Sequence, residues 1–329
     1  MPRPLTVVMP VHNVAPWLPG AIRSILQQTW QDFELWILEN GSTDQTLAVA
    51  KQFEQPPRVR VFDLGPVGFQ RALQFALQNV QSEWIARMDG DDVAVRERLE
   101  KQVAFVRSHP QYYLLGADYA VVTPFNHVYE VAGRLASRPL TTHSFTLIDS
   151  SARRFCGDPT VLFKRQAALQ VGGYDLDFSL GDVPLWIRIL QKYPGWEMAD
   201  LLYLYRLQPN SVSQTNPDGC AIRRKYGLSV PEQDGELALC PRRMTPRATY
   251  WRRILKLELR SGDSRVLWKV ARCLWSEGEY RLALLGCLFA CAGKSGAWLH
   301  ARRYPQSRLR RKDLEATYAA LLPSGPSPA

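Results

Sequence analysis

Three carboxylates, those of Asp89, Asp91 and Asp92, follow directly after a mostly apolar segment at 84–88. A segment of this kind is typical of a buried strand, and open α/β sheets bind ligands outside the carboxyl ends of their strands. Negative charges packed this closely repel one another, and a cation bound between them would relieve the repulsion. Hard oxygen ligands favour Mg²⁺ or Mn²⁺, and these ions usually also hold substrate phosphates. The cluster therefore predicts a site for a divalent metal and a diphosphate.

A second interpretation of the same three acids stays open. The cluster precedes a predicted helix at 96–106. Aspartate is common at helix N-termini, where its side chain caps main-chain N–H groups. On this interpretation the acids form a solvated turn and bind no ligand. The elements around the cluster must decide between the two.

Hydrophobic periodicity predicts strands and helices that alternate along the first half of the chain. The predicted strands cover 5–9, 33–38, 59–62 and 84–88, and the predicted helices cover 21–26, 68–80 and 96–106, with another that starts at Gln45. Further helices are predicted at 164–170 and 183–192, and a strand at 202–205 ends this domain. The alternation predicts an α/β fold with a doubly wound, mixed but mostly parallel sheet.

Shifts in composition divide the chain into four parts. We expect an α/β domain at 1–215 and a linker at 216–246, where Pro, Gly and charged residues mix. A basic, Trp-rich helical region is expected at 247–322, in which 274–292 resembles a helical hairpin. The last residues, 323–329, are expected to form a disordered tail.

The composition is that of an ordinary globular protein, with 46% hydrophobic and 22% charged residues. The apolar stretches are too short to span a bilayer. We expect no signal peptide, because the first residues lead into a strand-like segment without an apolar core. The six cysteines include no C-x-x-C pair, which fits reduced thiols better than disulfides or a zinc site. A cytoplasmic location is therefore expected.

The net charge of +10 is unevenly distributed. Residues 221–329 carry 21 Lys and Arg against 9 Asp and Glu, whereas residues 1–220 carry 20 against 22. A basic C-terminal third favours an anionic partner, such as a membrane surface, a nucleic acid or an acidic substrate. Solvated helix faces would explain the same charges equally well.

Five motifs occur in order over the first two thirds of the chain. They are Val8-Met9-Pro10-Val11-His12-Asn13, the segment 34–44, Asp89-Gly90-Asp91-Asp92, Gly172-Gly173-Tyr174-Asp175, and Gly181-Asp182 followed by Leu185-Trp186-Ile187-Arg188. Together they resemble the family 2 inverting glycosyltransferases, which have the GT-A nucleotide-sugar fold. Each motif is weak alone, but five in order at fitting spacing are a strong signal. The resemblance implies transfer of a sugar from a nucleotide-sugar, expected to be UDP-linked, to a saccharide or lipid-linked acceptor in bacterial cell-surface polysaccharide synthesis.

The same resemblance implies where the donor binds. The loop that contains Pro10, Val11 and His12 is expected against the nucleoside. The pair Glu39-Asn40 takes the place where the family often has two aspartates that bind ribose and base. Asn40 suits uracil, because an amide both accepts from the ring N–H and donates to the neighbouring carbonyl oxygen, but it also suits cytosine.

The remaining roles also follow from the resemblance. Asp91 is expected near the ribose and the metal, and Asp92 as a direct ligand of Mg or Mn. The metal would neutralise the charge that develops on the departing diphosphate. Asp182 is the expected catalytic base, which takes the proton of the acceptor hydroxyl. As an alternative, Asp182 is a plain cap of its helix.

Departures from the family pattern leave competing functions open. Gly181 replaces an acidic neighbour of the base, and Gln208 takes the place of a histidine that can approach the metal. A member that binds a nucleotide-sugar or a partner without turnover therefore stays an alternative. A nucleotidyltransferase is disfavoured, because such enzymes usually carry a Gly-rich basic loop after the first strand, where this chain has Pro10–Asn13.

Tryptophans and basic residues occur together in the C-terminal region, a combination typical of helices at a membrane interface. They are Trp251, Trp268, Trp275 and Trp298 with Arg252, Arg253, Lys256, Arg302, Arg303, Arg310, Arg311 and Lys312. Because acceptors in this family are often lipid-linked, the pattern favours peripheral contact with the inner face of the cell membrane. Packing on the catalytic domain or a dimer contact would explain the tryptophans equally well, and no nucleic-acid partner is expected.

Overall fold

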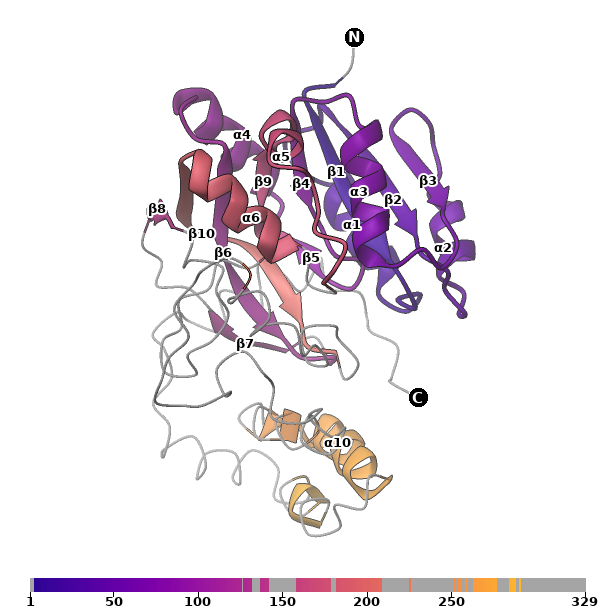
Figure 1. The fold of residues 1–329 in the computed structure, drawn as a ribbon. Helices are drawn as coiled ribbons and strands as arrows, with labels where there is room; N and C mark the ends of the chain where they lie inside the picture. The colour runs from indigo at the N-terminus through magenta and orange to yellow at the C-terminus, as the bar shows by residue number, and fades with distance from the viewer. Residues whose placement is uncertain are drawn as a thin grey trace.

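A computed structural model shows a twisted sheet with helices on both faces and a small helical unit beside it (Figure 1). The structure describes residues 3–125, 127–131, 137–141, 158–178, 182–208 and 225, and further on 251, 254–255, 258–259, 263–276, 284–287 and 290. Among these residues, no helix has the length and apolar character needed to cross a membrane.

The sheet has ten strands, eight of which follow one another in the order β3-β2-β1-β4-β9-β6-β10-β5, while β7 pairs with β6 and β8 with β10. Their bounds are β1 Leu5–Val11, β2 Phe33–Glu39, β3 Val59–Asp63, β4 Trp84–Arg87, β5 Val93–Ala94, β6 Leu114–Val122, β7 Val128–Val131, β8 Arg138–Leu140, β9 Leu162–Lys164 and β10 Gly195–Arg206. Strands β1 to β4, β6 and β10 run in one direction, and the other strands run against them. The predicted mixed, mostly parallel sheet is confirmed.

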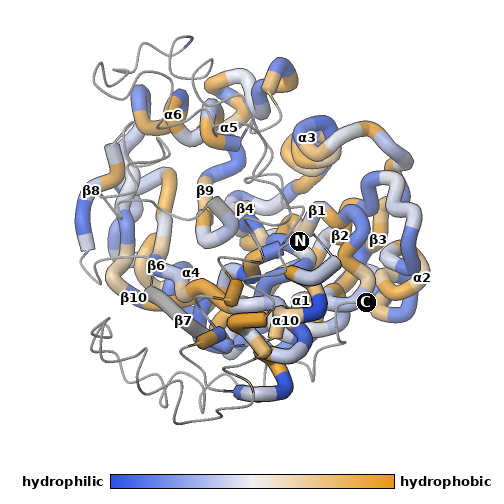
Figure 2. The backbone as a smooth tube through the Cα atoms, turned by 90° about the horizontal axis from the view of Figure 1, so that it is seen from below, coloured by the Kyte–Doolittle hydropathy of each residue, from blue (hydrophilic) through white to orange (hydrophobic). Residues whose placement is uncertain are grey.

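Two hydrophobic cores lie on the two faces of the sheet. Helices α1 (Leu18–Leu26), α2 (Thr46–Gln52) and α4 (Arg98–Ser108) contribute to one, and α3 (Phe69–Asn79), α5 (Arg165–Gln170) and α6 (Asp182–Lys192) contribute to the other. Along β1, Val7 and Met9 belong to the first core and Val8 to the second. Because both faces are covered, the central strands are apolar at nearly every position, as their sequences predicted. Figure 2 colours the backbone by hydropathy and shows apolar segments inside the fold.

Five strands and part of a sixth were not predicted. Three of them, β6, β7 and β8, lie in a segment to which no strand was assigned. Strand β9 has only three residues and leads at once into α5, so its residues were partly assigned to a helix beginning at 164. Strand β5 has two residues and pairs with β10 through Tyr203 and Leu204. The predicted strand at 202–205 in fact begins at Gly195, because register shifts interrupt its pairing with β6 and break its apolar pattern.

A third hydrophobic cluster belongs to the C-terminal residues. Helix α10 (Ser264–Ser276) contributes Val270 and Leu274, which group with Trp251, Ile254 and, from the end of β10, Leu207. Helix α10 lies in the expected helical region and overlaps the predicted hairpin at 274–292 only in its last three residues. Apart from Lys225, the predicted linker lies outside the described residues, as do the predicted tail, Gly181 and Trp298.

Candidate active site

The loop after β1 is fastened to the loop after β2. Asn13, which has a φ of 52°, accepts hydrogen bonds at Oδ1 from the main-chain N–H groups of Thr43 and Asp44, at 2.8 and 3.3 Å. Its own N–H donates to the hydroxyl of Ser42 over 3.0 Å. The ring of His12 lies beside this contact, with Nδ1 3.0 Å from the carbonyl oxygen of Asn40. These bonds turn two loops that are distant in sequence into one surface at the carboxyl end of the sheet.

The acid loop after β4 packs against the same surface through Gly90. A Cβ added to Gly90 would lie 2.7 Å from Cγ1 of Val11 and 3.1 Å from Cγ2 of Val14. The close approach explains why glycine stands between the acids, since a side chain there would push the two loops apart. The loops after β1, β2 and β4 therefore meet at one edge of the sheet, as the strand order predicted.

Glu39 and Asn40 are partly engaged in holding the second loop. The buried carboxylate of Glu39 accepts hydrogen bonds from the N–H groups of Gly41 and Ser42, at 3.1 and 2.6 Å. Oδ1 of Asn40 accepts a hydrogen bond of 2.8 Å from the N–H of Gly68, at the start of α3. The amide nitrogen of Asn40 keeps two N–H groups that are suited to a ligand with carbonyl oxygens.

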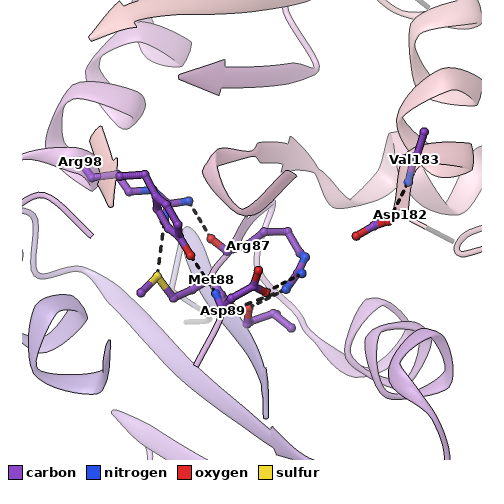
Figure 3. A network of polar contacts seen from close by, with 8 residues as sticks. Arg87, Met88, Asp89, Arg98, Asp182 and Val183 are labelled. Carbon is purple, nitrogen blue, oxygen red and sulfur yellow. Dashed lines mark hydrogen bonds and ion pairs between the residues drawn. The ribbon is translucent and has the colours of Figure 1, made fainter. Parts of the chain in front are cut away.

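Behind the acids lies a buried group that sequence patterns did not indicate (Figure 3). Arg87 is fully buried, and its Nη2 lies 3.0 Å from Oδ1 of Asp89. Arg98, also buried, donates from Nη2 to the carbonyl oxygen of Arg87 over 2.7 Å, and its guanidinium lies over the ring of Tyr203. The hydroxyl of Tyr203 accepts a hydrogen bond of 3.0 Å from the N–H of Asp89. These contacts orient the acid loop from the protein side, so Asp89 has a supporting role.

Asp91 and Asp92 are held by Arg206, at the end of β10. The N–H of Arg206 donates to Oδ1 of Asp92 over 2.7 Å, and its Nε donates to the carbonyl oxygen of Asp91 over 2.8 Å. Burial and the charge of Asp89 raise the pKa of Asp91 to about 7, although Arg206 and Gln208 act in the opposite direction. Burial and the neighbouring carboxylates of Asp91 and Asp89 also raise the pKa of Asp92 well above its usual range. The structure thus places two acids that repel each other side by side, with Asp92 buried and Asp91 half-buried.

The donor chemistry of this pair fits a divalent cation. Oδ2 of Asp92 is buried and accepts no hydrogen bond within the described part of the chain. A buried carboxylate oxygen without a partner is suited to a cation, which would also compensate the repulsion between Asp91 and Asp92. The described residues contain no group of three His, Cys, Asp or Glu side chains arranged to hold a metal. Two carboxylates are nevertheless enough for Mg²⁺, whose other ligands are commonly phosphates and water.

Gln208 lies next to the pair, where the family pattern has a histidine. It is buried, and its amide favours the ionised form of Asp91 and so lowers the pKa of that acid. Leu207, between Arg206 and Gln208, belongs to the C-terminal hydrophobic cluster instead. The strand end therefore presents alternate residues to the acids and to the helical unit.

On the other side of the site, Arg188 joins the motif that begins with Gly172-Gly173 to its own motif on α6. Its guanidinium donates hydrogen bonds to the carbonyl oxygens of Val171, over 2.6 Å, and of Gly173. Gly173 has a φ of 72°, and a Cβ there would lie 2.4 Å from Oε1 of Gln74, which itself accepts from the N–H of Tyr174. Arg188 therefore fixes the Gly-Gly turn between α3 and α6. Both motifs thus have a role in holding the fold together.

Asp182 is the first residue of α6 and is 5% exposed. Its Oδ1 accepts a hydrogen bond of 2.9 Å from the N–H of Val183. Figure 3 shows Asp182 standing apart from Asp89 and from the arginines around it. Two other acids of this region, Asp175 and Asp177, lie 2.9 and 3.0 Å from Nζ of Lys225 and are thus paired. Arg71 is exposed on α3, in agreement with a surface role.

Residues 6–167 match the family model described as Glycosyl transferase family 2. The O-antigen biosynthesis glycosyltransferase WbnJ of Escherichia coli is 31% identical over 221 residues, a match that covers 64% of this chain and 82% of WbnJ. The chain belongs to glycosyltransferase family 2. The matched range contains the loops after β1, β2 and β4, whereas Asp182 and Arg206 follow it in sequence.

Other proteins agree with this membership in sequence or in fold. The amylovoran biosynthesis glycosyltransferase AmsE of Erwinia amylovora is 28% identical over 200 residues, which cover 60% of this chain and 73% of AmsE. A solved structure of S. aureus TarS in complex with UDP-GlcNAc matches with a TM-score of 0.56 at 15% identity, over 94% of this chain and 93% of the other. At that identity the likeness concerns the fold, and it confirms the predicted GT-A architecture.

Proposed function

We propose that this family 2 glycosyltransferase performs metal-dependent, inverting transfer of a sugar from a UDP-sugar to a saccharide or lipid-linked acceptor. The observation that carries the proposal is the placement of Asp91 and Asp92. Both acids are fixed by Arg206 at the edge of the sheet where the loops after β1, β2 and β4 meet. A donor diphosphate at this edge would lie next to the acids, with its nucleoside over the first two loops.

On the donor side, His12 and the last two residues of β1, Pro10 and Val11, would lie against the nucleoside. The base would be recognised by Asn40, whose amide nitrogen donates while its Oδ1 is already hydrogen-bonded to Gly68. A free N–H donor pairs with a carbonyl oxygen of uracil, and cytosine offers a similar acceptor. The carboxylate of Glu39 has further lone pairs for a ribose hydroxyl besides those used by Gly41 and Ser42.

Asp91 and Asp92 are the residues that would hold Mg²⁺ or Mn²⁺. When bound, the ion supplies charge stabilisation for the departing diphosphate. The protein's own contribution is orientation, because Arg206, Tyr203 and Asp89 hold the acid loop before any ligand arrives. A site prepared in this way does not have to reorganise during the reaction.

On the acceptor side, Asp182 would act as the base. The acceptor hydroxyl attacks the anomeric carbon from the side opposite the diphosphate, the bond to the diphosphate oxygen breaks, and the hydroxyl proton passes to the carboxylate. The N–H of Val183 donates to Oδ1 of Asp182 at the start of α6, which would orient the carboxylate that takes the proton. The separation of Asp182 from the acid loop leaves the sugar and the acceptor room between them.

The setting is proposed from the named relatives. WbnJ and AmsE are glycosyltransferases of O-antigen and amylovoran biosynthesis, which are bacterial surface polysaccharides. A similar role here would place the enzyme in the cytoplasm. A lipid-linked acceptor would bring it into peripheral contact with the inner face of the cell membrane.

A second candidate is a member of the family that binds a nucleotide-sugar without turnover. It is favoured by Glu39, whose carboxylate organises its own loop, and by Gln208, which cannot titrate. This candidate predicts metal-dependent UDP binding without any release of UDP from UDP-sugars.

Thermal-shift measurements with UDP, GDP, CDP and dTDP, each with and without Mn²⁺, test the proposed donor. We expect stabilisation by UDP that needs both Mn²⁺ and Asp92, and that is lost in Asp92→Ala. The matched control is Asp32→Ala, which removes an exposed acid elsewhere. Stabilisation by another nucleotide would contradict the UDP assignment, and stabilisation that persists in Asp92→Ala would contradict the metal site. Release of UDP from UDP-sugars in the presence of acceptor then separates an enzyme from a binding protein.

A further inference from the structure

Helix α10 has two faces of different character. Its buried residues are Val266, Leu267, Val270, Ala271 and Leu274. The other side, here called the basic Trp face, consists of the exposed residues Arg265, Trp268, Lys269, Arg272 and Trp275. The pairs Arg265 and Arg272, and Trp268 and Trp275, are each two helical turns apart and thus lie on the same side. The two kinds of side chain therefore form one stripe along the helix.

The tryptophans of this stripe lie at the surface, and another tryptophan of the region does not. Trp268 is 46% exposed and Trp275 is 54% exposed, whereas Trp251 is 4% exposed within the cluster. Packing of the helical unit explains the burial of Trp251, whereas Trp268 and Trp275 stay exposed to solvent. Exposed large apolar side chains gathered in one place commonly mark a contact with a partner.

The exposed apolar residues are concentrated in this small unit. Within the described part of the chain, the large hydrophobic residues that are exposed are Val67, Leu176, Trp268, Trp275, Leu284 and Leu285. Four of these six belong to the C-terminal unit, although it contributes few of the described residues. The catalytic domain shows no comparable group among its described residues, so the apolar exposure is a local property of the unit.

The stripe is also purely cationic. Helix α10 contains Arg265, Lys269 and Arg272 and no acidic residue. The nearest acids in sequence are Asp263, which precedes the helix, and Glu277, which follows it. Oδ1 of Asp263 accepts from the N–H groups of Arg265 and Val266, over 2.9 and 3.3 Å. Asp263 thus caps the helix and does not lie among the cations of the stripe. The charge complement of this face is a negatively charged surface.

We propose that the basic Trp face of α10 docks on a bilayer that contains anionic lipids. Tryptophan has an apolar ring and a polar N–H, and it prefers the level of the lipid headgroups. Lysine and arginine next to it are attracted to the negative surface of the cytoplasmic leaflet. A stripe that combines tryptophans and cations satisfies both preferences at once. The inference concerns a surface distant from the acids and holds whether or not the donor is UDP.

The position of α10 gives such docking a consequence for the site. The helical unit lies beyond the ends of β6 and β10 (Figure 1), and its cluster includes Leu207. The residues on either side of Leu207 contact the catalytic acids. A bilayer bound to α10 would therefore hold the acid loop at a set height above the membrane, within reach of a lipid-linked acceptor.

Vesicle flotation of the full chain tests the docking surface. The probes are vesicles of phosphatidylcholine alone and of phosphatidylcholine mixed equally with phosphatidylglycerol, without nucleotide. We expect binding to the mixed vesicles, loss of at least about tenfold in affinity for Arg265→Gln/Lys269→Gln/Arg272→Gln, and a similar loss for Trp268→Ser/Trp275→Ser. The matched control, Arg60→Gln/Arg96→Gln/Lys192→Gln, removes three exposed cations elsewhere and is expected to bind like the wild type.

Three results would overturn the proposal. The first is an absence of binding to the mixed vesicles by a wild-type chain whose circular dichroism shows it to be folded. The second is an equal loss in the control variant, which would make the binding a property of net charge. The third is a different partner for the same residues. This partner would be either duplex DNA, bound in a salt-sensitive way and more tightly than the vesicles, or a second copy of the chain, in a dimer that the tryptophan variants dissociate. Nucleotide binding measured on the same variants is expected to be unchanged, so that failure of docking and failure of the donor proposal are told apart.

Discussion

The main-chain N–H of Arg206 donates a hydrogen bond of 2.7 Å to Oδ1 of Asp92, although the two residues are 114 positions apart. The side chain of Arg206 also donates to the carbonyl oxygen of Asp91 and to that of Thr123, at 2.8 and 3.2 Å. Because Arg206 is buried, these bonds are shielded from water and specific in direction. The end of β10 is thus part of the proposed catalytic site, and its neighbour Leu207 ties the C-terminal helical unit to it.

Leu207→Ala is expected to loosen the helical unit. The substitution leaves a cavity in the C-terminal cluster and lowers the free energy of unfolding by about 3 kcal/mol. Leu204→Ala, three residues earlier in β10 but packed with Val93 in another cluster, is the matched control. Both variants should lose stability, and hydrogen exchange should show faster opening at 264–276 in Leu207→Ala alone. Equal exchange in both variants would contradict a specific link through Leu207.

Gly90→Ala is expected to separate the loop after β1 from the acid loop. The new methyl group would lie 2.7 Å from Cγ1 of Val11, so we expect a loss of about 1–3 kcal/mol in the free energy of unfolding. Shortening the neighbour should compensate part of this, and the double variant Val11→Ala/Gly90→Ala should lose less than the two single variants together. Urea unfolding of the four proteins measures this coupling. Strict additivity would mean that the contact is not the cause.

The pKa of Asp91 predicts how stability depends on pH without metal. Its carboxyl has a pKa of about 7 in the folded protein, against an ordinary value of 3.8, so the folded state holds a proton that the unfolded state releases. This contribution to stability is fully present below about pH 4 and is lost as the pH rises through about 7. Asp91→Asn removes the contribution of Asp91 to this dependence, while Asp92, whose pKa is also raised, keeps its own. At pH 8 without metal we expect the variant to melt a few degrees above the wild type, and the difference to shrink towards pH 5. A difference that is constant with pH would contradict the raised pKa.

Asp182→Asn is expected to slow transfer without weakening the donor. Asparagine can still accept the N–H of Val183 at the start of α6, so stability should change little. Loss of the base should lower kcat by about 10²–10⁴ while the KM for the donor is kept. The control is Asp177→Asn, an exposed acid paired with Lys225. A kcat in Asp182→Asn close to that of the control would remove Asp182 from the mechanism.

Arg188→Ala is expected to disturb the acceptor side. The change leaves the carbonyl groups of Val171 and Gly173 without their guanidinium donor, which should cost about 2 kcal/mol of stability and lower kcat. Arg165→Ala is a matched control, since Arg165 also donates to two carbonyl groups, those of Leu77 and Gln78, at the end of α3. We expect the control to lose stability but keep kcat. UDP binding, measured by calorimetry, should be unchanged in both.

The order of the first strands and the place of the acids could be predicted from sequence. Strands β1, β2 and β4 are covered on both faces, so their residues are apolar almost throughout, and this signal is local. The glycine of Asp89-Gly90-Asp91-Asp92 and the turn residues after β2 mark the strand ends. Once the strands are parallel and adjacent, their loops must meet at one edge, which places Pro10, Asn40 and Asp92 together.

Other features depend on contacts between residues far apart in the chain, which no local pattern indicates. Strand β9 is too short to show a period, and it exists because β4 and β6 offer it partners on both sides. The composition identified Arg87, Arg98 and Arg206 only as charged residues, whereas folding buries all three around the acid loop. The sequence did not show which tryptophans are buried and which are exposed, since both arrangements fit an amphipathic helix. Only the packing of the helical unit decides this. The residue types of the chain thus specify the strands and the chemistry of their loops. The burial that raises the pKa of Asp91, and the alternation that links Leu207 to the acids, arise from the tertiary packing alone.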